Sequence, residues 1–306
     1  MKIVIAGFSG LIGNSLVEHL HTEGHELILL TRSPESVSAE WHEKGLVERW
    51  APPSIGTLVE LLDGVDAVIN LAGAPIDRRW TDTYKTLLWT SRIDSTKALV
   101  NAMAKCKQPP KVFACASAIG FYDGYPIDSP MITENDSKGT GFISDLCDAW
   151  EKEAQKALLS GTRVVNVRIG LVLTENGGMI SKIKLPFILG VGGHIGTGKQ
   201  WCPWVHIDDV VGIFEHVIKT ESVQGPVHAV APEVVSFAQF CKEFAKQLNR
   251  WSLFHVSSFV LKLVFGEMSS IMLNTPPVGS TITKQHHYEF KYSALSKALN
   301  SILVER

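Results

Sequence analysis

The sequence predicts an α/β protein built on a doubly wound parallel sheet, with a smaller unit on its C-terminal side. Two observations support this fold class. Through residues 1–170, short apolar runs alternate with amphipathic helical stretches and are joined by short links, an order typical of parallel strands connected by crossover helices. The runs are apolar throughout rather than alternating with polar residues, as expected for strands that helices cover on both faces.

The strands are expected at these apolar runs, and the helices between them. The first run, KIVIAG, ends at a glycine and leads into a helix that Gly24 terminates. Strands are predicted at 2–7, 26–32, 46–50, 66–73, 111–117 and 162–170. Further helices are predicted at TLVELLDG, at 81–106 and at FISDLCDAWEKEA (142–154). In the last of these, Phe142, Leu146 and Trp150 share an apolar face at helical spacing.

The pattern changes after residue 170, where a glycine-rich stretch begins. A strand end with a helix at 205–219, a short strand at 226–232, a helix at 236–250 and a final helix at YSALSKAL follow. We therefore expect one domain from 1–170, completed by 205–232. The remaining residues, 171–204 and 233–306, are expected to form a second unit beside the carboxyl edge of the sheet, where ligands of such sheets bind.

Composition excludes several classes of partner. The formal net charge is −2, so no strong positive field is available to attract nucleic acid or an anionic membrane. The N-terminus lacks the pattern of a signal peptide, and no apolar run reaches the length of a membrane span. The five cysteines are an odd number without a C-x-x-C pair, which favours a reducing, cytoplasmic compartment. No metal site is predicted.

The first strand leads into GFSGLIG, whose glycines Gly7, Gly10 and Gly13 are spaced as in a dinucleotide-binding turn. Gly7 permits a tight exit from the strand, Gly10 lets the backbone approach a pyrophosphate, and Gly13 lets the helix pack closely. The strand before and the amphipathic helix after this turn give it the context that a Rossmann-type site requires. The remaining residues of the predicted contact are Phe8, Ser9, Leu11 and Ile12.

The end of the second strand favours NADP(H) over NAD(H). An NAD site has a carboxylate there to accept from the ribose 2′-hydroxyl, but this strand ends in Thr31 and Arg32. A guanidinium pairs with a 2′-phosphate, whereas a carboxylate would repel it. The alternative is an arginine that is merely solvated at a strand end.

A second glycine-rich segment, GHIGTGKQ (193–200), matches the phosphate loop of nucleoside triphosphatases only superficially. Gln200 replaces the Ser or Thr that would bind Mg²⁺, and no predicted strand precedes the segment. A loop over a substrate pocket is the better interpretation.

With these motifs in place, the chain resembles the extended short-chain dehydrogenase/reductase superfamily. Within it, the resemblance is to the atypical branch labelled the nucleoside-diphosphate-sugar epimerase family. NLAG (70–73), ASAIGFY (116–122), RIGLVL and GGHIGTGKQWCPWVHIDD carry this resemblance beside the glycine turn. The resemblance implies further cofactor contacts at Leu71, Ala72, Gly73, Arg92, Leu171 and Val172. For Arg92 the alternative is an ordinary residue on the surface of a helix.

The resemblance also implies a catalytic Tyr and, four residues later, a Lys on the helix at 142–154. Their positions hold Ile143 and Cys147, which cannot perform the standard proton transfer, and Cys147 is expected to pack in the core. The remaining catalytic candidates are Ser117, at the position of the superfamily's catalytic serine, and Tyr122.

Other polar and aromatic residues suggest a substrate pocket. Trp201, Trp204 and His206 are expected to line it. For His206 a catalytic role is the less favoured alternative, and Asp208 is expected to cap the helix that follows. The loop acids Asp123, Asp128 and Glu134 show no constraint in the sequence.

Two functions are therefore predicted. The first is an NADP(H)-dependent oxidoreductase or epimerase of atypical mechanism that acts on a small polar molecule, with nucleotide sugars as one class. The second is an NADP(H)-binding protein with little catalysis that serves in regulation or redox sensing. The sequence leaves the substrate, the direction of hydride transfer and the oligomeric state open.

Overall fold

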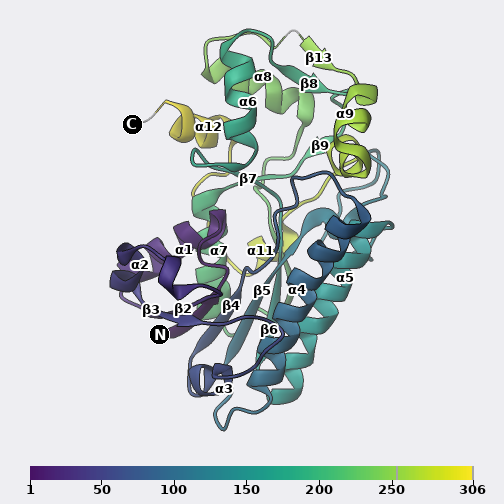
Figure 1. The fold of residues 1–306 in the computed structure, drawn as a ribbon. Coiled ribbons are helices and arrows are strands. Elements are labelled where there is room, and N and C mark those ends of the chain that lie inside the picture. Colours follow the sequence, from purple (N-terminus) through teal and green to yellow (C-terminus); the bar gives the residue numbers. More distant parts are fainter. Residues whose placement is uncertain (253, 305–306) are drawn as a thin grey trace.

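The computed structural model describes residues 1–252 and 254–304. Seven strands form one sheet in the order β11-β6-β5-β4-β1-β2-β3 (Figure 1). Their bounds are β1 (Lys2–Ala6), β2 (Glu26–Thr31), β3 (Leu46–Arg49), β4 (Ala67–Asn70), β5 (Val112–Ala118), β6 (Arg163–Ile169) and β11 (Gly225–Ala229). Every neighbouring pair is parallel. The predicted doubly wound α/β fold is confirmed.

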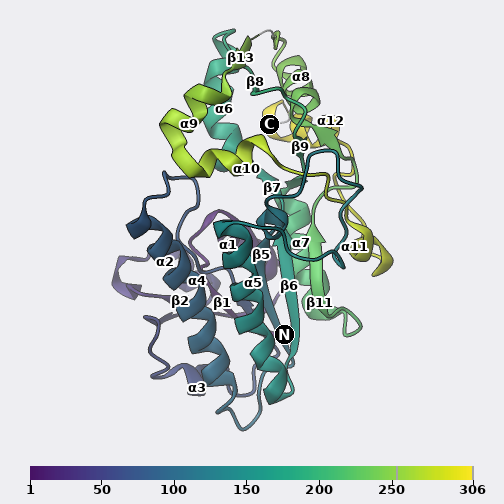
Figure 2. The same ribbon diagram turned by 90° about the vertical axis from the view of Figure 1, so that its right-hand side faces the viewer.

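Helices cover both faces of this sheet. On one face α4 (Asp82–Met103) and α5 (Phe142–Gln155) lie side by side, and on the other α1 (Leu11–Thr22) packs against α7 (Ile207–Lys219) (Figures 1 and 2). Because each strand points its side chains to both faces, a sheet covered in this way needs strands that are apolar throughout. This explains the continuous apolar runs of the sequence.

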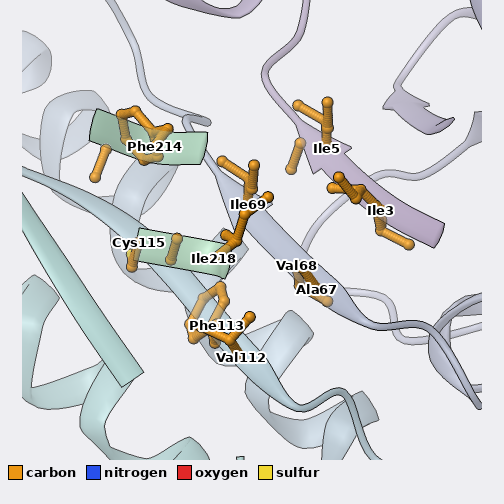
Figure 3. Packing of buried hydrophobic residues seen from close by; sticks show 14 of the residues in the cluster. Ile3, Ile5, Ala67, Val68, Ile69, Val112, Phe113, Cys115, Phe214 and Ile218 are labelled. Atoms are coloured by element: carbon orange, nitrogen blue, oxygen red, sulfur yellow. The ribbon is translucent and has the colours of Figure 1, made fainter. Parts of the chain in front are cut away.

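The central core lies between the sheet and its helices. Ile5, Ile69 and Phe113 from three strands are fully buried, and Phe214 from α7 belongs to the same cluster (Figure 3). Each such side chain contributes about 1.5–3 kcal/mol relative to an exposed position. The sheet therefore forms a rigid support whose carboxyl edge positions the loops described below.

The remaining elements are short, and most belong to the C-terminal half of the chain. The further helices are α2 (Ala39–Lys44), α3 (Leu58–Leu62), α6 (Gly178–Ile188), α8 (Phe237–Gln247), α9 (Ser258–Phe265), α10 (Ser270–Leu273), α11 (Thr281–Gln285) and α12 (Leu295–Leu303). The 3-10 helices are η1 (Pro34–Ser36), η2 (Ile119–Tyr122), η3 (Lys156–Ser160) and η4 (Gly266–Ser269). The further strands are β7 (Leu171–Leu173), β8 (Gly193–Ile195), β9 (Trp201–Cys202), β10 (Trp204–His206), β12 (Val235–Ser236) and β13 (Phe254–Val256).

Helices α6, α8, α9 and α12 gather at the carboxyl end of the sheet strands (Figures 1 and 2). Phe187, Phe240 and Phe244 form part of a second apolar cluster there, separate from the sheet core. The segment with α11 leaves this group and returns to the sheet, where Ile282 packs against the main core. In the part of the chain that the structure describes, no helix has the length and apolar composition needed to cross a membrane.

Two polar side chains have roles that the sequence did not indicate. His206, rather than Asp208, caps α7, because its Nδ1 atom accepts a hydrogen bond from the Asp208 N–H at 3.1 Å. Glu134 is constrained: its carboxylate is buried and accepts from the backbone N–H groups of His228 and Ile282. Both partners of Glu134 are far away in the sequence, so no local pattern indicates these contacts.

Candidate functional site

The glycine turn between β1 and α1 brings three backbone segments into close contact. Gly7 has a φ of +83°, and a β-carbon there would lie 2.7 Å from the backbone nitrogen of Ala72. A β-carbon at Gly13 would overlap the Gly7 carbonyl oxygen and come within 2.6 Å of the Cα atom of Phe8. Both positions therefore require glycine, for the turn and for the close helix packing that the sequence predicted.

The N-terminus of α1 is open. Gly10 is its N-cap and is exposed, no side chain caps the helix, and its first turn contains no acidic residue. A β-carbon at Gly10 would meet only the Gly7 carbonyl oxygen, at 3.4 Å. The first-turn N–H groups lack intrahelical partners, and together with the helix dipole they favour an anion.

The residues around this helix end differ in exposure. Ser9 and Leu11 are exposed and Ile12 is half-buried, whereas the ring of Phe8 is buried and packs edge-on against Trp41 with 5.0 Å between centroids. Phe8 therefore supports the turn from within. Leu11 also lies near the start of α6, since a β-carbon at Gly177 would come within 2.9 Å of its Cδ1 atom.

The carboxyl ends of β2 and β3 carry two guanidinium groups. The Arg32 side chain is exposed and has no partner among the described residues. Arg49, which pairs in register with Thr31, donates to the Arg32 carbonyl oxygen at 3.0 Å and to the Glu35 carboxylate at 2.6 Å. The first acid after β2 is thus paired with Arg49, and the edge remains positive. Arg49 was missed because the strand register that places it there is not visible in the sequence.

The turn after β4 is held by a buried amide. Asn70 accepts from the Ala72 N–H at 3.1 Å and donates to the Thr96 hydroxyl at 2.9 Å. The Leu71 N–H donates to the carbonyl oxygen of Ala6 at 2.8 Å. These bonds place Leu71 and Ala72, both half-buried, directly beside the glycine turn.

Arg92 extends from α4 to this same edge. Its guanidinium donates to the carbonyl oxygens of Ala74 at 3.0 Å and Leu88 at 3.2 Å, and its Cζ atom lies 5.2 Å from the ring centroid of Trp150. Gly73 lies directly over it, because a β-carbon there would be 3.0 Å from that Cζ atom. Arg92 is therefore no ordinary surface residue of a helix.

The positions expected for a catalytic Tyr and Lys are buried on α5. Ile143 and Cys147 are 3% and 2% exposed. A β-carbon at Gly120 would lie 2.8 Å from Ile143 and 3.9 Å from the Cys147 sulfur. Burial raises the pKa of Cys147 to about 12, so the thiol stays protonated near neutral pH and behaves as a packing residue.

Ser117, at the end of β5, is tied to a buried ion pair. Its hydroxyl donates to Glu151 Oε1 at 2.6 Å, and Arg168 donates to both carboxylate oxygens of Glu151 at 2.8 Å. All three side chains are buried. Because the Ser117 proton is engaged with Glu151, this hydroxyl has only lone pairs left for a ligand.

Tyr122 lies at the other end of the same ion pair. Its hydroxyl accepts from Arg168 and lies 2.8 Å from His228 Nε2 and 3.0 Å from the Thr133 carbonyl oxygen. The Nδ1 atom of His228 is 2.6 Å from the Gly279 carbonyl oxygen, which requires a proton on Nδ1 and leaves Nε2 as the acceptor. Tyr122 is fully buried, and burial raises its pKa.

We call the set Ser117, Glu151, Arg168, Tyr122, His228 and Glu134 the buried polar network. Sequence reasoning identified only Ser117 and Tyr122 from this set. The burial of its other members was not predicted because charged residues are mostly exposed in proteins. Their burial depends on contacts between segments that lie far apart in the chain.

The three residues expected to line a substrate pocket differ in how far they are buried. Trp201 is half-buried and donates from Nε1 to the Ile127 carbonyl oxygen at 2.8 Å. Trp204 is fully buried in the second apolar cluster and donates to the Glu233 carbonyl oxygen at 3.0 Å. His206 is 5% exposed and its ring packs on Tyr292 with 3.9 Å between centroids. Burial lowers the pKa of His206. Trp204 and His206 are thus occupied by packing contacts within the protein. Trp201 is the most accessible of the three.

Leu171 and Val172 continue the chain just beyond β6. Both are half-buried in β7, which pairs with β10 in parallel. They therefore lie at the carboxyl edge, between the sheet and the second apolar cluster. A groove of about 910 Å³ lies between α8 and α12, and none of the predicted site residues lines it.

Comparison with known proteins places this arrangement in a family. The sequence pattern of the NAD dependent epimerase/dehydratase family matches residues 3–231. An epimerase family protein of Staphylococcus saprophyticus is 35% identical over 98% of each chain.

Solved structures agree with this match. Human epimerase family protein SDR39U1 (isoform 2), crystallised with NADPH, is similar with a TM-score of 0.87 and 31% identity over 99% of each chain. A nucleoside-diphosphate sugar epimerase from Corynebacterium glutamicum is similar with a TM-score of 0.79 and 28% identity, over 99% of this chain and 58% of that one. The resemblance that the motifs predicted is confirmed: the chain belongs to the NAD dependent epimerase/dehydratase family.

Proposed function

We propose that the protein binds NADP(H) and acts as an oxidoreductase or epimerase of atypical mechanism on a small polar substrate. One observation carries this proposal. The uncapped N-terminus of α1 lies on a turn that only glycine can form, and the nearby ends of β2 and β3 carry Arg32 and Arg49. Such a turn suits a pyrophosphate, and a free guanidinium beside it suits a 2′-phosphate.

The residues present fit the dinucleotide along the whole edge. Leu11 and Ile12 would hold the pyrophosphate through backbone N–H groups, and Arg32 the 2′-phosphate. The Gly10 N–H already donates to the Gly7 carbonyl oxygen, so Gly10 would contribute by leaving room for the pyrophosphate. The turn of Leu71 to Gly73 would contact the adenosine and ribose, and Leu171 and Val172 the nicotinamide. The similarity to a human protein crystallised with NADPH supports this assignment. When bound, the cofactor supplies or accepts a hydride next to the substrate.

Ser117 is the group we assign to the substrate. Its proton is donated to Glu151, so toward a ligand it acts as a hydrogen-bond acceptor and favours a substrate hydroxyl over a carbonyl. Sugars offer such hydroxyls. The similarity to a protein described as a nucleoside-diphosphate sugar epimerase makes nucleotide sugars the first class to test.

The alternative function is NADP(H) binding with little turnover, in regulation or redox sensing. It is favoured by the state of the candidate proton donors. Tyr122 is fully buried with its hydroxyl engaged on all sides, and α5 carries Ile143 and Cys147 in place of the usual pair. No ionisable hydroxyl with an open face takes the place of the missing Tyr among the residues described above.

A substrate screen separates the two functions. Wild-type protein is incubated with NADPH or NADP⁺ and panels of alcohols, carbonyl compounds and nucleotide sugars, while NADPH absorbance and product isomers are followed. Turnover that Ser117→Ala reduces by a factor of roughly ten to a thousand supports the enzyme. Tight NADPH binding without turnover of any panel member supports the alternative.

A further inference from the structure

Large apolar side chains are exposed together at the end of the molecule where α6 ends and where β13 and α9 lie (Figures 1 and 2). Trp251 is 79% exposed, Phe259 73% and Leu189 66%. Single exposed apolar residues are normal, but a contiguous group of them marks an interaction site. We call this surface the apolar cap and define it by Leu185, Leu189, Trp251, Phe254, Phe259 and Leu263.

Three contacts make the apolar cap one continuous surface. The Arg250 Nε atom donates to the Ile188 carbonyl oxygen at 3.1 Å, which joins the end of α6 to the chain just before β13. Strand β13 pairs in parallel with β8, and Phe254 lies opposite Gly193 in this register. Helix α9 follows β13 directly and is capped by the Ser257 hydroxyl. The end of α6, β13 and α9 are therefore neighbours in space.

Helix α9 is apolar on all sides. Its sequence, SFVLKLVF, contains one charged residue. Leu261 is buried and Phe265 is half-buried against an apolar cluster of the interior. Phe259 and Leu263, four residues apart, share the opposite face and are exposed. Because a helix that is apolar all round is expected to be buried all round, the outer face of α9 has the composition of a surface that a partner covers.

Cations without ion-pair partners surround the apolar cap. Within the described residues, no carboxylate pairs with Lys184, Lys242, Arg250 or Lys262. Two acids on neighbouring segments are already paired. Asp77 forms an ion pair with Lys182 of α6, and Glu267, just after α9, forms one with Lys85. The rim of the apolar cap therefore carries positive charge that this chain does not neutralise.

The charge of the whole chain conceals this distribution. Residues 171–204 and 233–306 contain eleven Lys and Arg and six Asp and Glu, a formal charge of +5, whereas the rest of the chain carries −7. A net charge of −2 leaves no strong positive field over the molecule as a whole, but the end that carries the apolar cap is positive.

We propose that the apolar cap docks on the surface of an anionic lipid bilayer. Its aromatic and aliphatic side chains would enter the headgroup region, as those of an interfacial amphipathic helix do. Arg250 and Lys262 would lie against the lipid phosphates, with their aliphatic stems among the apolar side chains. The residues assigned to the cofactor lie outside the apolar cap, so this inference does not depend on the proposed NADP(H) site.

A second copy of this chain fits the apolar cap less well than a lipid surface. A twofold contact places the same patch of both subunits face to face. Arg250 and Lys262 would then meet the same cations of the other copy, and like charges brought together in this way oppose association. Anionic lipids would neutralise these cations instead.

Sedimentation with vesicles tests the apolar part of the proposal. Full-length protein is mixed with vesicles of phosphatidylcholine, or with vesicles in which part of this lipid is replaced by phosphatidylglycerol. Wild type is expected to bind the second kind and to bind less as salt is added. The double variant Phe259→Ser, Leu263→Ser is expected to bind roughly tenfold less or weaker still. Leu159→Ser is the control, because Leu159 is 91% exposed but lies in η3, outside the apolar cap.

A matched pair of lysines tests the charge. Lys262→Gln is expected to weaken binding to the phosphatidylglycerol vesicles by roughly fivefold, the effect of one cation near an anionic surface. Lys107→Gln removes an exposed lysine before β5, at the opposite edge of the sheet, and should leave binding unchanged. Equal effects of the two changes would contradict the proposed contact with lipid phosphates.

Trp251 reports insertion directly. The tryptophan emission of wild type is expected to shift to shorter wavelength when phosphatidylglycerol vesicles are added, because the indole leaves water. Trp251→Phe keeps an aromatic ring in the apolar cap but should lose this shift. A shift of the same size in Trp251→Phe would mean that another tryptophan enters the lipid, and would contradict docking through the apolar cap.

Three further results would overturn the proposal. The first is a wild type that does not bind the phosphatidylglycerol vesicles, or binds both kinds of vesicle equally. The second is equal binding by Leu159→Ser and by a folded double variant, with folding checked by circular dichroism. The third is a dimer of wild type in sedimentation velocity without lipid that the double variant abolishes, which would assign the apolar cap to a second copy of the chain.

Discussion

The hydroxyl of Ser117 donates a 2.6 Å hydrogen bond to Glu151, which lies one helical turn beyond Cys147 on α5. The position at which the resemblance implies a lysine, Cys147, is therefore followed on the same face by a buried carboxylate. That carboxylate both orients Ser117 and neutralises Arg168. This face of α5 therefore supports the buried polar network.

Removing the charge of Glu151 should strongly destabilise the protein. Glu151→Ala leaves Arg168 buried without its partner, and breaking a buried ion pair in this way costs about 3–5 kcal/mol of unfolding free energy. Urea unfolding followed by circular dichroism measures the loss. The matched control on the same helix is Asp148→Asn, which removes an accessible pair with Lys152 and should cost about 0.5 kcal/mol. Equal effects of the two changes would contradict the structural role of Glu151.

Tyr122→Phe should reduce stability while preserving cofactor binding. The change leaves His228 Nε2 and one Arg168 N–H without their shared partner, which costs about 1–3 kcal/mol for buried groups. Thermal unfolding and NADPH titration are measured on the same preparation. A variant of unchanged stability that loses turnover of an identified substrate would instead make Tyr122 a catalytic residue.

Gly10→Val should abolish NADPH binding in a protein that remains folded. The fold leaves room for a side chain at Gly10, whose β-carbon would meet only one atom at 3.4 Å, but that side chain would occupy the approach to the α1 N-terminus. Gly13→Val is the contrasting variant, because its β-carbon would overlap backbone atoms and should destabilise the fold itself. If Gly10→Val titrates with NADPH like wild type, the nucleotide does not bind at this turn.

Stability should fall as the pH decreases below about 6.5. Burial lowers the pKa of His228 from its ordinary value of 6.5, while Glu134 opposes and Arg168 adds to this effect. Below pH 6.5 the unfolded chain therefore binds a proton at His228 more readily than the folded protein does. The stabilisation is complete above pH 6.5 and is lost as the pH falls toward and through the lower pKa of the folded state. The test is the midpoint of urea unfolding, measured for wild type and His228→Gln at several values between about pH 7.5 and pH 4.5, a range that includes the ordinary pKa of an imidazole. The variant should show the shallower dependence, and identical slopes would exclude His228 as the cause.

The sequence was sufficient for the sheet and the glycine turn because both depend on local patterns. Continuous apolar runs predict the strands, and the spacing of Gly7, Gly10 and Gly13 predicts the turn that the structure contains. The end of the fourth strand was predicted too far along, since Asn70 bends the chain into a turn by bonding its own backbone two residues on.

The site was predicted less completely because its contacts join distant segments. Glu151 was not singled out on α5, although Arg168 and Ser117 hold it in the interior. Glu134 had no apparent constraint until the structure placed it against His228. The burial of Trp204 and His206 likewise results from packing against residues that are distant in the sequence, and local residue spacing cannot predict such contacts.

The most direct test of the account is the affinity of wild-type protein for NADPH and for NADH, measured by calorimetry in the same buffer. We predict that NADPH binds more tightly, and that Arg32→Ala removes most of the difference at a cost of about 1–3 kcal/mol in NADPH binding. Equal affinities of the wild type for the two cofactors would contradict the assignment of Arg32. Absence of binding to either one would contradict the proposed NADP(H) site as a whole.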